Sequence, residues 1–374
     1  MLKATFIQRS EGYRVYVPGD LPMDPALQLE GELLTLLSEA DQALARLDGA
    51  ASVMPNPDLF VAMYVRHEAV LSSRIEGTQS TLEDVLTREL EEGEPPRHPD
   101  VDEVLNYVRA MDYGLERIGG LPLSLRLLRE LHGRLMKGVR GDAANPGEFR
   151  RIPVWIGPKG ATIQEATFVP PTPDLLQAAL DNFEPFLHDR SLPVLVHSAL
   201  AHAQFELIHP FLDGNGRLGR LLVTLLLCER GLLHRPLLYL STFFETRRTE
   251  YYDRLNAVST SGDWKGWLKF FLAGVREVSN SAAKSAREIL HLRETHRKLV
   301  KGNANALRLL DHLFERPVIT NGYVQKLLNV SFPTASALVS KLESHSLLKE
   351  VTGSKRNRLY RYEPYLSIFE RRGT

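Results

Sequence analysis

The sequence predicts a mainly α-helical protein. Apolar residues recur three and four positions apart through most of its 374 residues, as in the run 27–47, and that spacing places them on one face of a helix. Segments rich in β-forming residues are short and lie near residues 152–169 and near the C-terminus. A chain of this length has room for two or three domains.

Each expected helix is marked by its apolar spacing and, in places, by signals at its ends. The helix expected over 58–76 is followed by Gly77, a residue type that commonly ends helices in the left-handed conformation. Ser80 and Glu83 form a capping-box pattern that opens the next helix, and the acidic stretch 89–99 is expected to be a loop. Further helices are predicted over 101–139 (two helices), 175–207, 217–231, 249–274 and 280–299.

Two segments depart from the long helical pattern. Residues 142–173 are rich in Pro and Gly and carry β-forming residues on both sides of Gly157-Pro-Lys-Gly160, so we expect a β-hairpin on a loop. The last segment predicts three helices and a hairpin, which is the order of elements in a winged-helix domain. These elements are expected at 306–314, 320–327, 334–345, and then 348–352 paired with 359–362.

Charge and cysteine content limit the classes of function. Lys plus Arg and Asp plus Glu each number 46, so the chain as a whole has no net charge to attract nucleic acid or an acidic membrane, although residues 301–374 carry 12 basic against six acidic residues. The single cysteine, Cys228, cannot form an internal disulfide, and we expect a reducing, cytoplasmic location. Neither a signal core nor an apolar run of membrane-spanning length occurs in the sequence, so no membrane contact is expected.

One loop gathers residue types that suit nucleotide chemistry. Residues 209–220 read HPFLDGNGRLGR, and an apolar helix follows. Such a glycine-containing loop can present backbone N–H groups to an anion, and the positive end of the helix dipole favours the same charge. Arg217 and Arg220 are three residues apart and can bind more than one phosphate. Asp213 offers hard oxygen ligands for Mg²⁺, and His209 is the residue type best suited to act as a general base near neutral pH.

This loop resembles the signature of the Fic family, His-Pro-Phe-x-Asp/Glu-Gly-Asn-Gly-Arg-x-x-Arg, and matches it at every fixed position. The resemblance implies a Fic helical core that transfers AMP from ATP to a Tyr, Ser or Thr hydroxyl of another protein or of the enzyme itself. It implies that His209 removes the proton from the attacking hydroxyl and that Asp213 holds Mg²⁺. The residues that it implies for ATP binding are Asp213, Gly214, Asn215, Gly216, Arg217, Gly219, Arg220, Tyr251 and Tyr252.

A second motif lies at the end of the helix expected over 58–76. Ser72-Ser-Arg-Ile-Glu-Gly77 resembles the family's inhibitory motif of Ser or Thr, three residues, Glu, and Gly or Asn. A carboxylate in the last turn of a helix faces the negative end of the dipole, so Glu76 needs a cationic partner. The resemblance implies that this partner is Arg220, that Ser72 and Glu76 are inhibitory, and that the pairing keeps Arg220 from the γ-phosphate.

Three further segments have counterparts in the family. The expected hairpin corresponds to a flap whose strand edge would hold the target peptide, and a plain surface hairpin with Trp155 in the core is the alternative. Tyr251 and Tyr252 correspond to adenine-pocket tyrosines, whereas Ser259 stands where many relatives carry an amide. The C-terminal segment, with a basic wing at 355–358, is expected to contact DNA, or else a protein, including a second copy in a homodimer.

We therefore predict three parts: an N-terminal helical region with the inhibitory helix (1–112), the Fic core (113–300) and a winged-helix domain (301–374). The predicted function is a Mg²⁺- and ATP-dependent protein adenylyltransferase that Glu76 inhibits. Two alternatives on the same fold stay open. One is a hydrolase that removes AMP from a modified protein, and the other is a DNA-binding regulator whose core senses a nucleotide, against which the intact His209 argues.

A rival interpretation of the loop also stays open. His202, Glu206, His209 and Asp213 follow helical spacing and could act together as metal ligands. Pro210 and the glycines argue against it, because they should break the helix before Asp213. The sequence also leaves a donor other than ATP open.

Overall fold

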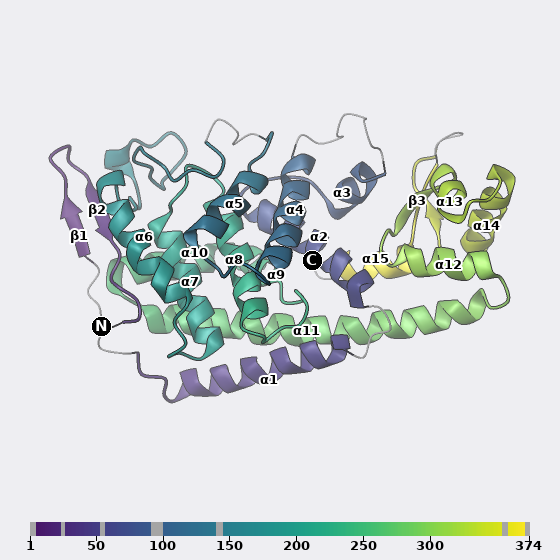
Figure 1. Ribbon diagram of the computed structural model, residues 1–374, viewed down its shortest axis with the longest axis horizontal. Helices are drawn as coiled ribbons and strands as arrows, with labels where there is room; N and C mark the ends of the chain where they lie inside the picture. The colour runs from purple at the N-terminus through teal and green to yellow at the C-terminus, as the bar shows by residue number, and fades with distance from the viewer. Residues whose placement is uncertain are drawn as a thin grey trace.

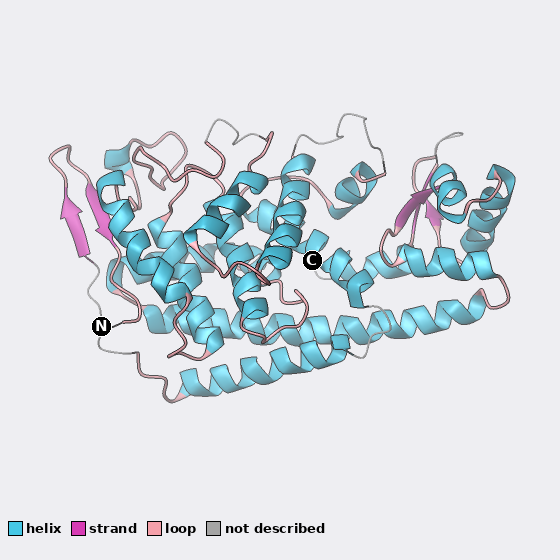
Figure 2. Ribbon diagram, in the orientation of Figure 1, coloured by secondary structure: helices cyan, strands magenta, loops and turns pink. Residues whose placement is uncertain are grey.

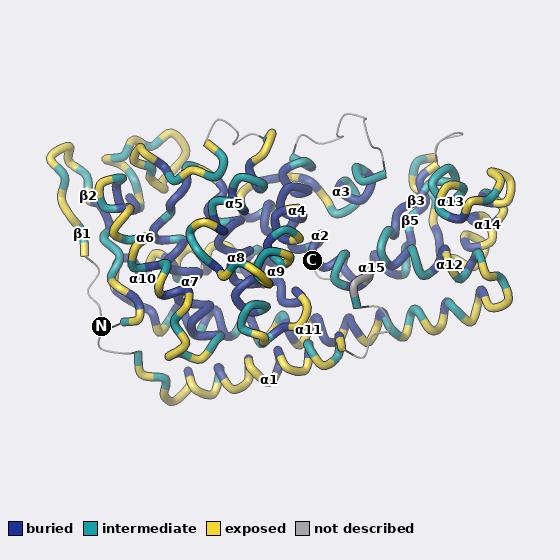
Figure 3. Tube along the Cα trace, in the orientation of Figure 1, coloured by how far each residue is buried: buried dark blue, intermediate teal, exposed yellow. Residues whose placement is uncertain are grey.

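The computed structural model describes residues 5–23, 27–52, 57–90, 100–139, 145–353 and 358–370. Over these ranges the molecule is elongated and mainly helical, as predicted, with a small sheet near each end of the chain (Figures 1 and 2). The helices gather at one end around a buried centre, and the last sheet lies with three helices at the other end (Figure 3).

The chain begins with an antiparallel hairpin of β1 (Thr5–Gln8) and β2 (Arg14–Val17), where the sequence predicted only an extended start. The backbone N–H of Tyr16 donates to the carbonyl oxygen of Val169 at 2.9 Å. The hairpin is thereby attached to the loop that precedes α6 (Pro173–Leu187).

The long helices α1 (Glu32–Ser52) and α11 (Trp264–Leu299) lie side by side along the length of the molecule (Figure 1). The buried face of α1 repeats every three or four residues, as the sequence predicted; it comprises Leu33, Leu37, Ala40, Ala43, Leu44 and Leu47. The sequence predicted two separate helices over 249–274 and 280–299, and this prediction of where the helices divide was wrong. The break falls earlier, between α10 (Arg248–Ser261) and α11, because Gly262 takes a left-handed φ of 69° and Asp263 caps α11 by accepting the N–H of Gly266 at 2.9 Å.

The N-terminal helices that follow are α2 (Pro57–Ile75), α3 (Leu82–Arg88), α4 (Val101–Arg117) and α5 (Leu125–Leu135). Gly77 follows α2 with φ of 98°, as its position predicted. The capping box of α3 was placed one residue too early: it is formed by Thr81 and Asp84, because Thr81 has the extended backbone whose hydroxyl can reach the N–H of Asp84 at 3.2 Å. Of the loop expected over 89–99, residues 91–99 lie outside the described ranges.

The central layer consists of α7 (Val194–Ile208) and α8 (Asn215–Glu229), which pack against each other. Almost every residue of both helices is buried (Figure 3), which fits the apolar residues that occur all around them. The short helix α9 (Ser241–Thr246) packs between α2 and α11. The loop from α7 to α8 therefore joins two fixed elements.

The β-hairpin expected within 142–173 was wrong. Residues 152–169 form a loop with one antiparallel bridge, Ile156 to Phe168, and a single 3₁₀ turn at Ile163–Glu165. Ile156 and Phe168 exchange both backbone hydrogen bonds, so the next bonded pairs of a ladder would be 154 with 170 and 158 with 166, and Pro158 and Pro170 lack the N–H groups that these pairs need. The side chain of Trp155 is 43% exposed, so a core position for this residue was also wrong.

The C-terminal elements follow the predicted order of three helices and a hairpin, with β3 and α15 added. The sheet has the antiparallel order β3-β5-β4. That this segment is a winged-helix domain stays a prediction. Residues 354–357, at the predicted wing, lie outside the described ranges. The elements are α12 (Ala304–Leu313), β3 (Val318–Thr320), α13 (Asn321–Leu328), α14 (Phe332–Ser344), β4 (Lys349–Glu350), β5 (Leu359–Arg361) and α15 (Glu363–Glu370).

Helix α15 returns from this sheet to the N-terminal helices. The ring of Phe369 lies 5.1 Å from that of Tyr64 on α2, and Arg361 forms an ion pair with Glu83 on α3 at 2.9 Å. The end of the chain thus helps to hold α2. Among the helices of the described ranges, none has the length and apolar character needed to cross a membrane.

We expect Leu44→Ala to lower the free energy of unfolding by about 2–5 kcal/mol, because Leu44 is 1% exposed between α1 and α11. Denaturant unfolding followed by circular dichroism measures this. Leu34→Ala is the matched control, since Leu34 lies on the same helix but is 53% exposed. Equal losses in the two variants would contradict the packing described for α1.

Candidate active site

The loop between α7 and α8 begins and ends with residues in the left-handed backbone region. His209 has φ of 51° and donates its backbone N–H to the carbonyl of Phe205 at 2.9 Å, while Gly214 has φ of 77° at the start of α8. A non-glycine residue in this region is uncommon and points to local constraint. The two positions turn the chain sharply, so that His209 lies beside the first turn of α8.

This geometry rules out the interpretation that His202, Glu206, His209 and Asp213 act together as metal ligands. Helix α7 ends at Ile208, so the helical spacing does not continue to Asp213. His202 is instead buried between the Gly219 carbonyl (Nδ1 to O, 2.9 Å) and the Tyr251 hydroxyl (Nε2 to O, 3.0 Å). In the part of the chain that the structure describes, no group of three or more His, Cys, Asp or Glu side chains could hold a metal ion.

Side chains from within the loop and from α5 fix its shape. The amide of Asn215 accepts the N–H of Phe211 and donates to its carbonyl, both at 2.9 Å, so this side chain is used within the loop. The ring of His132 stacks on Phe211 with centroids 3.8 Å apart. Since His132 Nδ1 accepts the N–H of Gly147 at 2.8 Å, its Nε2 carries the proton and donates to the Asp213 carbonyl at 3.0 Å.

The imidazole of His209 lines the adjacent cavity in a neutral form. Burial lowers its pKa to about 4, and the charge of Arg150 acts in the same direction, while a 3.3 Å contact from Nδ1 to the Glu206 carbonyl opposes both. A neutral imidazole at pH 7 can accept a proton. His209 is therefore unprotonated at neutral pH, as a general base must be before it accepts a proton.

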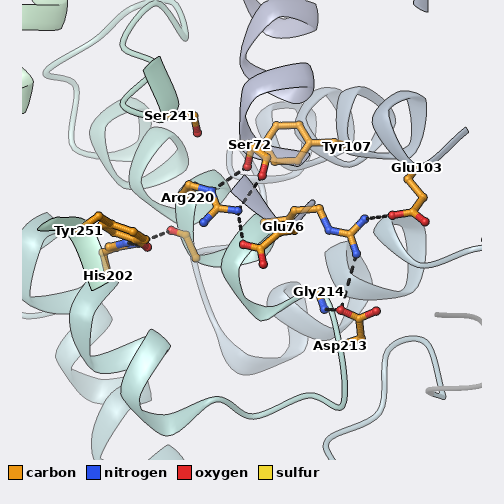
Figure 4. A network of polar contacts seen from close by, with 12 residues as sticks. Ser72, Glu76, Glu103, Tyr107, His202, Asp213, Gly214, Arg220, Ser241 and Tyr251 are labelled. Carbon is orange, nitrogen blue, oxygen red and sulfur yellow. Dashed lines mark hydrogen bonds and ion pairs between the residues drawn. The ribbon is translucent and has the colours of Figure 1, made fainter. Parts of the chain in front are cut away.

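The structure brings Arg220 and Glu76 together, as the resemblance implied (Figure 4). Arg220 Nη2 lies 2.6 Å from Glu76 Oε1 and 2.9 Å from the Ser72 carbonyl, and Arg220 Nε donates to Ser72 Oγ at 2.8 Å. Burial alone would lower the pKa of Arg220, but the negative charge of Glu76 and nearby acidic groups raises it. The guanidinium is 2% exposed and stays charged, so it requires an anion beside it.

The carboxylate of Glu76 also lies against the first turn of α8. A methyl group placed on Gly216 would come within 2.1 Å of Glu76 Oε1, so only glycine leaves room for the carboxylate there. The start of a helix favours negative charge through its dipole and its free N–H groups. Glu76 thus lies where the sequence predicts that phosphate binds.

Arg217 has a different neighbourhood from Arg220. It is buried and forms an ion pair with Glu103 of α4 at 2.9 Å (Figure 4 shows Glu103 at the right of the view and Arg220 at the left). No sequence pattern pointed to this partner, and Arg217 as a phosphate ligand stays a prediction. Asp213 keeps half of its side chain exposed, with Oδ1 accepting the N–H of Gly214 at 2.6 Å, so its other oxygen fits a Mg²⁺ ligand.

A cavity of about 460 Å³ opens beside these groups. Its walls include His209, Arg220, Tyr252, Asn256 and Glu206. Burial raises the pKa of the Glu206 carboxyl to about 7. Tyr252 is 41% exposed, whereas the predicted Tyr251 is 1% exposed and mostly fills the wall. Ser259, which stands where many relatives carry an amide, lines the cavity, and so does Asn256, about one turn earlier on α10, a residue that no sequence motif marked.

We expect Asn215→Ala to lower the free energy of unfolding by about 1–3 kcal/mol, because the backbone N–H and carbonyl of the buried Phe211 lose their partners. Denaturant unfolding measures this, with Asn280→Ala as control, since Asn280 is exposed and makes one long contact at 3.4 Å. If both variants were as stable as the parent protein, Asn215 would not fix the loop.

Comparison with known proteins places this site in a family. The profile of the Fic/DOC family N-terminal region matches residues 34–116, and that of the Fic/DOC family matches residues 122–227. Two proteins named "Protein adenylyltransferase Fic", from Drosophila virilis and Drosophila grimshawi, are 34% and 33% identical over 173 residues, or 45% of this chain. The matched region spans only 32% of the length of each of these relatives.

Solved structures share the fold. A Fic family protein from Desulfovibrio desulfuricans G20 aligns with a TM-score of 0.57 at 20% identity, over 90% of this chain and 97% of that one. A Fic domain containing signaling protein from Bacteroides thetaiotaomicron aligns with a TM-score of 0.52 at 17% identity, over 67% of this chain and 97% of that one. With the complete loop motif and both matching profiles, these comparisons show that the chain belongs to the Fic/DOC family.

Proposed function

We propose that the protein transfers AMP from ATP to a hydroxyl group of a protein and that Glu76 inhibits this transfer. The observation that supports the activity best is the neutral His209 beside the first turn of α8, in a cavity that also contains Arg220. The names of the relatives from the two Drosophila species point to the same reaction.

In the proposed reaction, His209 accepts the proton of the attacking hydroxyl. The hydroxyl oxygen bonds to the α-phosphorus of ATP as the bond to pyrophosphate breaks, so the products are an AMP ester and pyrophosphate. The first turn of α8 and Arg220 bind phosphate oxygens during this step. Asp213 would hold Mg²⁺, which neutralises phosphate charge when it is bound.

The cavity supports a nucleotide as the donor. Its volume of about 460 Å³ falls in the usual range of sites for small molecules and cofactors. We propose that the exposed ring of Tyr252 and the amide of Asn256 contact the base. Tyr251 acts behind them by bonding to His202.

The proposed inhibition arises because Glu76 and the terminal phosphates of ATP compete for the guanidinium of Arg220. While Arg220 binds Glu76 and Ser72, it has little capacity left for the terminal phosphates of ATP, and the Glu76 carboxylate itself repels them. Because Glu76 is 33% exposed, it can leave without exposing a buried core, whereas Arg220 cannot. We propose that movement of Glu76 away from α8 starts the reaction.

One observation also supports the reverse reaction as a second candidate. Glu76 and His209 line the same cavity, so the carboxylate could orient a water molecule towards the phosphorus of an AMP ester. In that case loss of Glu76 would abolish hydrolysis rather than release a transferase.

We further propose the division into an N-terminal region (1–112), a Fic core (113–300) and a winged-helix domain (301–374). The exposed face of α14 supports a protein contact, including a homodimer, over DNA, because Phe332 is 52% exposed there and few long cationic side chains accompany it. A cytoplasmic location fits Cys228, which is a free cysteine. Burial raises the pKa of its thiol to about 12.

We expect Glu76→Ala to raise the rate of AMP adduct formation at least about tenfold, because Arg220 becomes free to bind phosphate. Intact-mass analysis after incubation with Mg²⁺ and ATP, alone and with cell extract, measures the adduct. His209→Ala in the same background should form none.

Glu250→Ala is the matched control, since Glu250 pairs with Arg254 at 3.1 Å on the exposed face of α10 and should leave the rate unchanged. An adduct of equal rate in parent and Glu76→Ala proteins would contradict the inhibition. No adduct with any of these proteins would contradict the transferase.

A further inference from the structure

Arg150 binds the backbone around His209. Its Nε donates to the His209 carbonyl at 2.8 Å and its Nη2 donates to the Ile208 carbonyl at 3.3 Å. The backbone N–H of Arg150 also donates to the Pro210 carbonyl at 3.0 Å. Three consecutive carbonyls, at the end of α7 and the start of the motif loop, are therefore held by one residue.

The same guanidinium closes the loop of residues 151–170. Arg150 immediately precedes this loop, and its Nη2 also donates to the carbonyl of Pro171, which immediately follows it. A weaker contact of 3.5 Å reaches the Ile152 carbonyl. The loop contributes Ile156, Thr167 and Phe168 to the cavity, so Arg150 connects this wall of the cavity to the backbone of His209.

Arg150 is unusual among the buried arginines near the site. It is 3% exposed, yet no carboxylate lies within ion-pair distance of it in the described ranges, whereas Arg217 has two and Arg220 has one. Burial without an ionic partner lowers its pKa to about 10. A buried charge stabilised only by carbonyl oxygens is costly, which argues for a role beyond stability.

A positive charge at this place also acts on the imidazole. Burial is the main reason that the pKa of His209 is low, and the Arg150 charge lowers it further. Glu76 and Asp213 are the charged groups that act in the opposite direction. Arg150 thus opposes protonation of the base that the two carboxylates would promote.

We propose that Arg150 is a positioning residue that fixes His209 in its left-handed conformation and joins it to the loop that covers the nucleotide cavity. This inference rests on the proposed transfer of AMP. Removing the fork of donors would let the imidazole move relative to the α-phosphorus, while the phosphate-binding groups of α8 stay in place.

Arg150→Lys tests the positioning role in the Glu76→Ala background, because lysine keeps the charge but lacks the planar fork of N–H donors that reaches the carbonyls of both segments. We expect the rate of AMP adduct formation at saturating ATP to fall at least about tenfold, since small misplacement of a catalytic group is costly. The KM for ATP should change less than about twofold. An unchanged rate would overturn the proposal.

The matched control is Arg230→Lys in the same background. Arg230 is also largely buried and donates to the backbone carbonyls of Leu187 (3.1 Å) and Asp189 (2.5 Å), remote from His209. It should leave the rate unchanged. An equal fall in both variants would mean that loss of any such arginine slows the enzyme through stability, and would overturn the proposal.

NMR titration of the His209 imidazole, assigned with His209→Ala, keeps the inference separate from the reaction. Arg150→Met should raise the pKa of His209 relative to the parent, whereas Arg150→Lys should leave it nearly unchanged. If no protein forms an adduct, the proposed function fails and the titration alone decides: a raised pKa with Arg150→Met supports the inference, and an unchanged pKa overturns it. Circular dichroism checks whether each variant is folded. If the Arg150→Met protein is not folded, the rate of AMP adduct formation by the Arg150→Lys variant decides instead.

Discussion

The structure depends on how the buried guanidinium of Arg220 is neutralised. Its Nη2 lies 2.6 Å from Glu76, and Ser72 accepts from its Nε, so the last turns of α2 and the residue that follows the helix supply the hydrogen bonds and the charge that this group needs. Under the proposed function, a nucleotide phosphate supplies the same interactions, so Glu76 and the ligand would compete for Arg220. Packing of Tyr64 against Phe369 of α15 helps to fix the position of α2, on which that competition would depend.

Short-range features of this site could be predicted from the sequence. The loop motif identified His209 and Arg220, because a helix start preceded by glycine and followed by apolar residues is a local pattern. The pairing of Glu76 with Arg220, 144 residues apart, was predicted only through the resemblance of two motifs to one family. The mainly helical fold was predictable for the same local reason, since apolar spacing marks most helices.

Contacts set by tertiary packing could not be predicted. Arg217 was expected beside phosphate, but the packing of α8 on α4 places Glu103 next to it. His132 and Arg150 hold the motif loop from segments that carry no motif, and their partners are backbone carbonyls, which have no sequence signature. The expected hairpin failed for a different reason: its β-forming residues were correct, but the prolines among them cannot complete a ladder.

If Glu76 keeps Arg220 from the nucleotide, removing its carboxylate frees the guanidinium for phosphate. A crystal structure of the Glu76→Ala protein with a non-hydrolysable ATP analogue and Mg²⁺ tests this most directly. We expect the Arg220 guanidinium to bind a terminal phosphate oxygen at about 2.7–2.9 Å, with the α-phosphorus facing His209. An Arg220 that stays on Ser72 and makes no phosphate contact, in a site occupied by the analogue, would contradict it.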